Sequence, residues 1–338
     1  MGEVVAVLGA GAFGTALAQA AAHAGHQVRL WSIEAPVLAE IRQRRRNSHY
    51  LPGVRLHRRI QPCEGLTEAV AGASLVLVAV PSRAVRDVAR QLARTVSPGQ
   101  AVANAAKGLE EGTSLRMSQV LEQELPVAVR GSIATVGGPA IAREMARRRP
   151  TALVAAAREP EVAELVQGCL QNAWVRVAVS PDVVGVEVAA TLKNAYAIAL
   201  GLCDGLGMGA NVKATLTATC LAEMAEVVVC LGGHRDTAYG LAGLGDLLAT
   251  GYSPHSRNRT LGEKIGRGED WRHFLASNTV EGPAAVEACL RLVRPLGLPL
   301  PVLTGLHALL FLGADPMATL MALLEGAPPL PSWGSQPR

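Results

Sequence analysis

Lysine is scarce in this chain, and its few lysines are the first candidates for chemistry. Only four of the 32 basic residues are lysines: Lys107, Lys193, Lys213 and Lys264. Arginine stays protonated, whereas lysine can exchange a proton near neutral pH once its surroundings lower its pKa. Lys193 stands within the apolar helical pattern Val186–Leu202, where a normal ammonium group is costly to bury. The alternative is a lysine that reaches solvent along the edge of its helix.

A glycine pattern near the N-terminus indicates a dinucleotide site. The apolar run Val4–Leu8 predicts a strand, and Thr15–Ala24 predicts a helix. Gly9, Gly11 and Gly14 lie between them in the spacing G-x-G-x-x-G. The first glycine permits a tight turn, the second lets the backbone approach a pyrophosphate, and the third allows close helix–strand packing. The helix N-terminus would then face the phosphates. A purely structural turn is the alternative.

Two later segments carry polar groups that could serve a binding site, and the first of them suits an anionic ligand. The run Ser256-Arg257-Asn258-Arg259 offers hydroxyl, guanidinium and amide donors, which fit the oxygen atoms of a phosphate. An ordinary polar loop would have a similar composition. The run Gly240–Asp246 predicts a glycine-rich loop that ends in a carboxylate. Asp246 could cap a helix or pair with a lysine.

The first half of the chain alternates predicted strands with predicted helices. The strands are Val4–Leu8, Gln27–Trp31, Ser74–Val80, Gln100–Ala105, Ser132–Val136, Thr151–Ala156 and Val175–Ala178. The helices are Thr15–Ala24, Ala35–Arg45, Arg83–Thr95, Leu115–Gln123 and Glu161–Gln171. This alternation predicts an α/β fold with a mostly parallel, doubly wound sheet of the Rossmann type.

After about Pro181 the pattern becomes helical. Helices are predicted at Val186–Leu202, Lys213–Leu231, Pro283–Leu296 and Thr304–Phe311. We therefore expect a dinucleotide-binding domain over residues 1–181 and an all-helical substrate and catalytic domain over 182–325. A disordered tail is expected over 326–338, because Pro-rich segments bury too little apolar surface to fold.

Three unusual segments follow predicted strands and should meet at one edge of the sheet. They are Val80-Pro81-Ser82, Lys107-Gly108-Leu109-Glu110 and Gly137-Gly138-Pro139. Ligands of doubly wound sheets bind beyond the carboxyl ends of the strands. Each segment alone could be a simple turn, but together they predict one crevice.

Composition narrows the functional classes. A net charge of +4 is too diffuse to indicate nucleic-acid binding, although it suits a small anionic substrate. The six cysteines form no C-x-x-C pair and no secretory leader is recognisable, so reduced thiols and a cytoplasmic location are expected. The longest apolar candidate, Ala214–Leu231, contains Glu223 and Glu226, which argues against a membrane span. The eight histidines show no metal-binding spacing, and the apolar second half is compatible with a homodimer.

An ordered series of motifs resembles bacterial NAD(P)-dependent glycerol-3-phosphate dehydrogenase up to about residue 320. The motifs are Gly9–Ala18, Asn47-x-x-Tyr50-Leu51-Pro52, Val80-Pro81-Ser82, Ala106–Glu110, Gly138-Pro139, Leu192-Lys193-Asn194, Gly205–Asn211, Ala242–Asp246, Ser256–Arg259 and Val280-Glu281-Gly282. The resemblance implies an oxidoreductase that interconverts sn-glycerol 3-phosphate and dihydroxyacetone phosphate, with NAD or NADP as cofactor. Such a reaction feeds glycerophospholipid synthesis.

The resemblance also implies residue roles. Lys193 would exchange the proton at the substrate C2 oxygen, Lys107 would lie between nicotinamide and substrate, and Asp246 would orient these groups. The implied substrate contacts are Lys107, Gly138, Asn194, Asp246, Ser256, Arg257 and Asn258. The implied cofactor contacts are Gly9, Gly11, Ala12, Phe13, Gly14, Lys107, Ala142, Arg257, Val280 and Glu281. No metal is implied.

Some positions depart from the family pattern. Ala140 stands where members usually carry a hydroxyl, and Pro283-Ala284-Ala285 replaces an aromatic residue followed by threonine. Ser32-Ile33-Glu34 favours neither NAD nor NADP. The basic run Arg42–Arg46 is either a solvated helix end or a contact for a 2′-phosphate. A related dehydrogenase for another small anion, such as a β-hydroxy acid or ketopantoate, and a catalytically inactive cofactor sensor remain alternatives.

Overall fold

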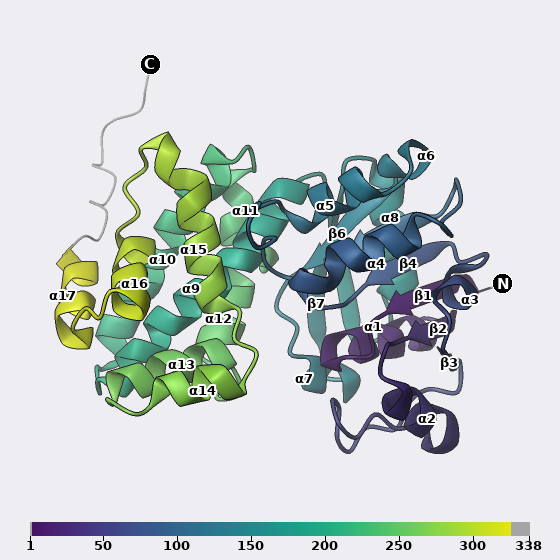
Figure 1. The fold of residues 1–338 in the computed structure, drawn as a ribbon, viewed down its shortest axis with the longest axis horizontal. Coiled ribbons are helices and arrows are strands. Elements are labelled where there is room, and N and C mark those ends of the chain that lie inside the picture. The colour runs from purple at the N-terminus through teal and green to yellow at the C-terminus, as the bar shows by residue number, and fades with distance from the viewer. Residues whose placement is uncertain (1, 326–338) are drawn as a thin grey trace.

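The computed structural model describes residues 2–325 and places a sheet in the first half and helices in the second (Figure 1). The expectation of a disordered tail over 326–338 concerns residues outside this range. The strands are β1 (Val4–Leu8), β2 (Gln27–Trp31), β3 (Ile60–Cys63), β4 (Leu75–Val78), β5 (Ala101–Asn104), β6 (Ile133–Gly137), β7 (Thr151–Ala157) and β8 (Val175–Ser180).

The eight strands form one sheet in the order β3-β2-β1-β4-β5-β6-β7-β8. All neighbours are parallel except β6 and β7, which are antiparallel. The chain builds the sheet outward from β1 in one direction through β2 and β3, and then in the other direction from β4 onward. The order therefore reverses between β1 and β4, as doubly wound folds require. The structure therefore confirms the mostly parallel, doubly wound sheet.

Helices cover both faces of the sheet (Figure 1). They are α1 (Ala12–His23), α2 (Ala35–Arg44), α3 (Leu66–Val70), α4 (Val85–Leu92), α5 (Met117–Glu124), α6 (Val127–Arg130), α7 (Ala142–Ala146) and α8 (Pro160–Leu170). Successive strand side chains point to opposite faces. Val5 and Val7 accordingly share a core with α1 and α8, whereas Ala6 and Leu8 share one with α3, α4 and α5. Burial on both faces explains why the central strands β1 and β4 are apolar throughout.

The second half is helical. Its helices are α9 (Val183–Gly205), α10 (Ala210–Cys230), α11 (Arg235–Tyr239), α12 (Asp246–Gly251), α13 (Arg257–Gly266), α14 (Trp271–Ser277), α15 (Gly282–Val293), α16 (Pro301–Phe311) and α17 (Pro316–Glu325). Helix α9 lies among the others and is buried continuously from Gly185 to Cys203. A Cβ at Gly262 of α13 would come within 1.9 Å of the Ile198 carbonyl, so glycine permits this close crossing.

Helix α9 is long and apolar enough to cross a membrane, but 89% of its most apolar window is buried inside the protein. It is therefore the core helix of the helical half. The six cysteines, all within the described range, form no disulfide. Residues 42–46 are exposed at the end of α2, as expected for a solvated helix end.

The sequence prediction missed one strand, β3, and several helices, which are α3, α6 and α7 in the first half and α11, α12, α13, α14 and α17 in the second. β3 is short, contains Pro62 and Gln61, and forms an edge of the sheet, where proline is tolerated. α3 has five residues, too few to show a helical period. The segment Val80-Pro81-Ser82 therefore follows the fourth strand rather than the third. The crevice expected at the carboxyl ends of the strands is unaffected, because β4, β5 and β6 are parallel.

The prediction of a glycine-rich loop over Gly240–Asp246 was wrong. Leu241–Gly245 forms a wide helical turn of the π type, and Asp246 begins α12. A Cβ at Gly243 would come within 2.0 Å of the Ala238 carbonyl. This glycine therefore serves close backbone packing inside a helical segment, although glycine is also typical of loops.

Each glycine of the first turn has a distinct reason to be glycine. Gly9 has a φ of +120°, which other residues rarely adopt. A Cβ at Gly14 would come within 2.0 Å of the Gly9 carbonyl oxygen. A Cβ at Gly11 would meet no atom within 4 Å. The fold itself therefore requires Gly9 and Gly14, whereas the open space beside Gly11 is available to a ligand.

This difference predicts that an alanine substitution lowers stability at Gly14 but not at Gly11. Gly14→Ala should lower the free energy of unfolding by about 1–3 kcal/mol, because backbone must move to admit the methyl group. Gly11→Ala should leave stability unchanged, because its φ is ordinary and its surroundings are open. Thermal denaturation of the two variants beside the wild type measures the difference. Equal melting temperatures would contradict the assigned packing role of Gly14.

Candidate active site

A buried carboxylate shared by two lysines lies where the two halves of the molecule meet. Lys193 Nζ donates to Asp246 Oδ1 at 3.0 Å, and Lys107 Nζ donates to Asp246 Oδ2 at 2.6 Å. The exposed side-chain fractions are 8% for Lys193, 15% for Lys107 and 3% for Asp246. The structure thus brings together three of the residues selected from the sequence, across 139 positions of chain.

Three elements position these side chains. Lys193 lies in the middle of α9, Asp246 is the first residue of α12, and Lys107 follows β5. Thr250, one turn along α12, donates to Asp246 Oδ1 at 3.3 Å and accepts from Lys193 Nζ at 2.8 Å. Lys193 is therefore held by two oxygen acceptors.

Burial sets the electrostatics of this cluster. Burial lowers the pKa of Lys193 to about 8, with the attraction of Asp246 opposing and the charge of Lys107 assisting. Burial alone would raise the pKa of Asp246, but the two lysines outweigh it and hold that pKa below its usual range. Asp246 is thus ionised at neutral pH, while Lys193 can exchange a proton close to physiological pH.

A cleft of about 310 Å³ opens beside Lys193. It is lined by Ala140, Ile141, Ala142, Lys193, Asn194, Ala249, Thr250, Ser253, His255, Ser256, Arg257, Asn258, Thr279 and Glu281. The lining comes from both halves of the chain, since residues 140–142 follow β6 and the others belong to the helical half. Seven of the residues selected from the sequence therefore border one cavity.

The start of α13 presents donors to this cleft. Ser256 caps the helix, because its Oγ accepts from the Arg259 N–H at 3.2 Å. Arg257 is exposed at the first helical position, and within residues 2–325 no acidic group lies within ion-pair distance of it. Arg259 points elsewhere, since Asp204 and Glu263 hold its guanidinium. The motif thus supplies one accessible arginine at a helix N-terminus, which suits an anion.

Asn194 and Asn258 are engaged with their neighbours. Asn258 Nδ2 donates to Asn194 Oδ1 at 2.9 Å, and Asn194 Nδ2 donates to Glu281 Oε2 at 3.0 Å. Asn258 Oδ1 accepts from the Gly282 N–H at 2.9 Å. This chain of amides fixes the wall of the cleft at the start of α15. Val280 packs against the core of the helical half and does not line the cleft.

The glycine turn lies next to the lysine cluster. The Phe13 ring centroid is 5.7 Å from Lys107 Nζ, and Ala12 and Phe13 form the partly exposed first turn of α1. The first N–H groups of that helix have no intrahelical acceptor. Gly138 has a φ of +106° and packs against the backbone of β7. Open space at Gly11 and free donors at α1 fit the pyrophosphate of a dinucleotide.

Sequence reasoning missed Thr250. Its signal was the spacing of four residues from Asp246, which places two side chains on one helical face. That signal was hidden because the preceding glycines were interpreted as a loop. His255 and Ser253 also line the cleft, and nothing in their local pattern marked them.

Comparison with known proteins agrees with this geometry. The model of the NAD-dependent glycerol-3-phosphate dehydrogenase N-terminus matches residues 4–163, and the model of its C-terminus matches residues 182–321. The chain belongs to the NAD-dependent glycerol-3-phosphate dehydrogenase family. The matched ranges include the glycine turn and all three residues of the lysine–aspartate cluster.

Individual relatives span nearly the whole chain. A glycerol-3-phosphate dehydrogenase [NAD(P)+] from Moorella thermoacetica is 41% identical over 96% of this chain and 96% of its own length. One from Bacillus mycoides is 38% identical over 94% and 95%. The crystal structure of a glycerol-3-phosphate dehydrogenase from Coxiella burnetii, 32% identical, superposes with a TM-score of 0.88 over 96% of this chain and 99% of that one.

A family outside these dehydrogenases shares only the architecture. A ketopantoate reductase from Ralstonia eutropha is 19% identical, with a TM-score of 0.58 over 95% of this chain and 99% of that one. This likeness shows the fold alone.

Removal of the shared carboxylate should destabilise the protein in a pH-dependent way. Asp246→Asn keeps one acceptor oxygen but removes the negative charge shared by two buried ammonium groups, and should cost about 3–5 kcal/mol at pH 7. The folded pKa of Lys193 already lies below its unfolded value, so its linkage increases stability as pH rises through the folded pKa. Without Asp246 the pKa of Lys193 falls further, so the variant begins to gain stability at a lower pH than the wild type. The difference in free energy of unfolding between wild type and variant should therefore shrink between pH 7 and 9.

Chemical denaturation at several pH values measures this deficit. Asp236→Asn, at an exposed position in α11, provides a matched control that should show little change. A deficit in Asp246→Asn that grows with pH would contradict the assigned electrostatics.

Proposed function

We propose that this protein interconverts sn-glycerol 3-phosphate and dihydroxyacetone phosphate, with NAD or NADP as cofactor, and so supplies glycerophospholipid synthesis. The observation that carries the proposal is the Lys107–Asp246–Lys193 cluster beside a cleft that also holds Arg257. Residues 1–181 form the dinucleotide-binding domain and 182–325 the substrate domain. Membership of the family supports this division of labour.

The phosphate of the substrate binds at the N-terminus of α13. Ser256 and Arg257 supply hydroxyl and guanidinium donors, and the helix dipole adds to the attraction. Asn194 and Asn258 shape the adjoining wall, and the Gly138 backbone contributes a contact from the sheet. A small phosphorylated substrate is consistent with a cleft of about 310 Å³.

The cofactor binds along the glycine turn and reaches the lysine cluster. Gly9 and Gly14 hold the turn, the open space at Gly11 admits the pyrophosphate, and Ala12 and Phe13 line the path of the cofactor towards Lys107. The side of the cleft formed by Ala142, Arg257 and Glu281 would hold the nicotinamide half, with Val280 packed behind it. When bound, the nicotinamide supplies or accepts the hydride at the substrate C2.

The chain itself manages the proton and the charge. Lys193, with its pKa lowered to about 8, donates the proton to the C2 oxygen during ketone reduction and takes it back in the reverse direction. Lys107 places a second positive charge beside the oxygen as it becomes an alkoxide. Asp246 holds both ammonium groups in place through its two oxygens. Because reduction needs protonated Lys193, its rate should fall above about pH 8.

The setting of the enzyme follows from the same assignment. We infer a cytoplasmic enzyme, in keeping with its six unpaired cysteines in the described chain. A homodimer is consistent with exposed apolar side chains around α16 and α17, including Phe311, Leu312 and Met321.

The proposed reaction is tested by absorbance at the reduced-nicotinamide band, with dihydroxyacetone phosphate and either NADH or NADPH. We expect the signal to decay, and the ratio of the two rates gives the cofactor preference. Ketopantoate serves as the control substrate, because a ketopantoate reductase shares the fold, and it should give no decay. Binding of both cofactors without decay on dihydroxyacetone phosphate would contradict the proposed substrate.

The assigned proton donor is tested by Lys193→Arg. Arginine retains the positive charge, but its pKa is too high for proton exchange, so kcat should fall at least about 100-fold. Lys213→Arg is the matched control, because Lys213 is ion-paired with Asp204 away from the cleft, and it should keep most activity. Near wild-type turnover in Lys193→Arg, with an unchanged melting temperature, would show that another group moves the proton.

A further inference from the structure

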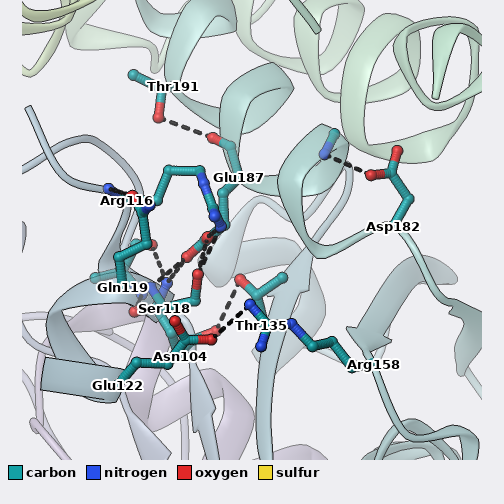
Figure 2. A network of polar contacts seen from close by, with 12 residues as sticks. Asn104, Arg116, Ser118, Gln119, Glu122, Thr135, Arg158, Asp182, Glu187 and Thr191 are labelled. Carbon is teal, nitrogen blue, oxygen red and sulfur yellow. Dashed lines mark hydrogen bonds and ion pairs between the residues drawn. The ribbon is translucent and has the colours of Figure 1, made fainter. Parts of the chain in front are cut away.

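Glu187 is a buried carboxylate that the proposed chemistry does not use. It lies on α9, the helix that carries Lys193, and only 5% of its surface is exposed. Figure 2 shows it surrounded by polar groups of the dinucleotide-binding half. Burying an ionised carboxylate is expensive unless charge and hydrogen-bond donors compensate it. The identity of those donors indicates what Glu187 is for.

Four contacts join Glu187 to the other half of the molecule. Its Oε2 accepts from Arg116 Nη1 at 2.8 Å and from Ser118 Oγ at 2.5 Å. Its Oε1 accepts from the Ser118 N–H at 2.8 Å and from Asn104 Nδ2 at 3.4 Å. Both oxygens are thus saturated by groups from β5 and the start of α5 (Figure 2).

These donors stand at the two ends of the segment that carries Lys107. Asn104 is the last residue of β5. Its side-chain amide also makes two hydrogen bonds with the backbone of Ala106. Asn104 Nδ2 donates to the Ala106 carbonyl, and the Ala106 N–H donates to Asn104 Oδ1, both at 2.9 Å. Arg116 and Ser118 stand at the start of α5, where the segment ends. One carboxylate therefore fastens both ends of residues 105–116 to α9.

We propose that Glu187 is a positioning residue that fixes the Lys107 segment against the helix carrying Lys193, and so sets the geometry of the lysine–aspartate cluster. The inference rests on the proposed function, because it concerns the residues assigned to that reaction. Glu187 acts through Asn104, Arg116 and Ser118 rather than by touching substrate.

The position of Lys107 affects the pKa of Lys193, which can be measured. The charged groups that face Lys193 are Asp246, Lys107 and Glu281, and Lys107 helps to keep its pKa low. If Lys107 moves away, Lys193 loses a repelling charge. The Asp246 carboxylate, no longer shared with Lys107, then attracts the Lys193 ammonium group more strongly. Both changes raise the pKa of Lys193, so the limit of the pH profile that reports Lys193 should move to higher pH.

The test is Glu187→Gln, an isosteric change. Its oxygen can still accept from Ser118 N–H, but its NH₂ group would face the Arg116 guanidinium, a donor against a donor. We expect kcat for dihydroxyacetone phosphate reduction to fall about tenfold or more, as for a small misplacement of a catalytic group. The alkaline limit of the kcat profile should shift upward.

Ser118→Ala is the second variant, chosen in case Glu187→Gln folds poorly. It removes the hydroxyl that donates to Glu187 Oε2 and accepts from Arg116 Nη1 at 2.7 Å, and it leaves Arg116 paired with Glu187. A smaller fall in kcat and a smaller shift of the pH limit in the same direction are expected.

Glu223→Gln is the matched control. Glu223 is another buried carboxylate, and it accepts from the Val302 and Leu303 N–H groups at the start of α16, with no contact to the Lys107 segment. We expect this variant to change the melting temperature but to keep the wild-type pH limit. A merely structural role for Glu187 predicts the same behaviour for Glu187→Gln.

The outcomes separate the inference from the function on which it rests. A wild type that does not oxidise NADH with dihydroxyacetone phosphate would overturn the proposed function. An active wild type with Glu187→Gln at the same kcat and pH limit would overturn the positioning role alone. A lowered kcat with an unmoved pH limit in both Glu187→Gln and Ser118→Ala would also overturn it.

Discussion

The division of one carboxylate between two buried ammonium groups is the constraint on which the rest of this structure depends. The two lysines compensate the burial of Asp246 and hold its pKa low, and Asp246 in turn favours the charged form of Lys193. The arrangement carries one net positive charge at the mouth of a cleft, where an anionic substrate and a developing alkoxide would both be stabilised. The packing of α9 through the centre of the helical half holds one member of this cluster rigidly.

A consequence of this constraint is that the sheet half and the helical half must keep a fixed position relative to each other. Lys107 belongs to the sheet domain, whereas Lys193 and Asp246 belong to the helical one, so any sliding between the halves would break the cluster. Glu187 provides a second polar attachment between the halves, at the opposite side of the Lys107 segment. Polar contacts with fixed geometry specify register more narrowly than an apolar interface, because they fail when displaced by an ångström or two.

Much of the fold was predictable because its signals are local. β1 and β2 have the predicted bounds, since apolar runs flanked by turn residues define strands directly. The glycine turn was equally readable, because its spacing follows from steric limits within a few residues. β3 and the helical turn over Leu241–Gly245 were not, since a short edge strand and close-packed glycines owe their conformation to distant neighbours.

The sequence by itself therefore determined the doubly wound sheet, the helical second half, and the three residues of the lysine–aspartate cluster as separate candidates. Only the tertiary structure decided that one carboxylate joins them, that Asn194 and Asn258 are committed to each other, and that Arg257 rather than Arg259 faces the cleft. The physical reason is that strand and helix periods are encoded over neighbouring residues. The pairing of buried charges depends on which side chains packing brings within hydrogen-bond distance.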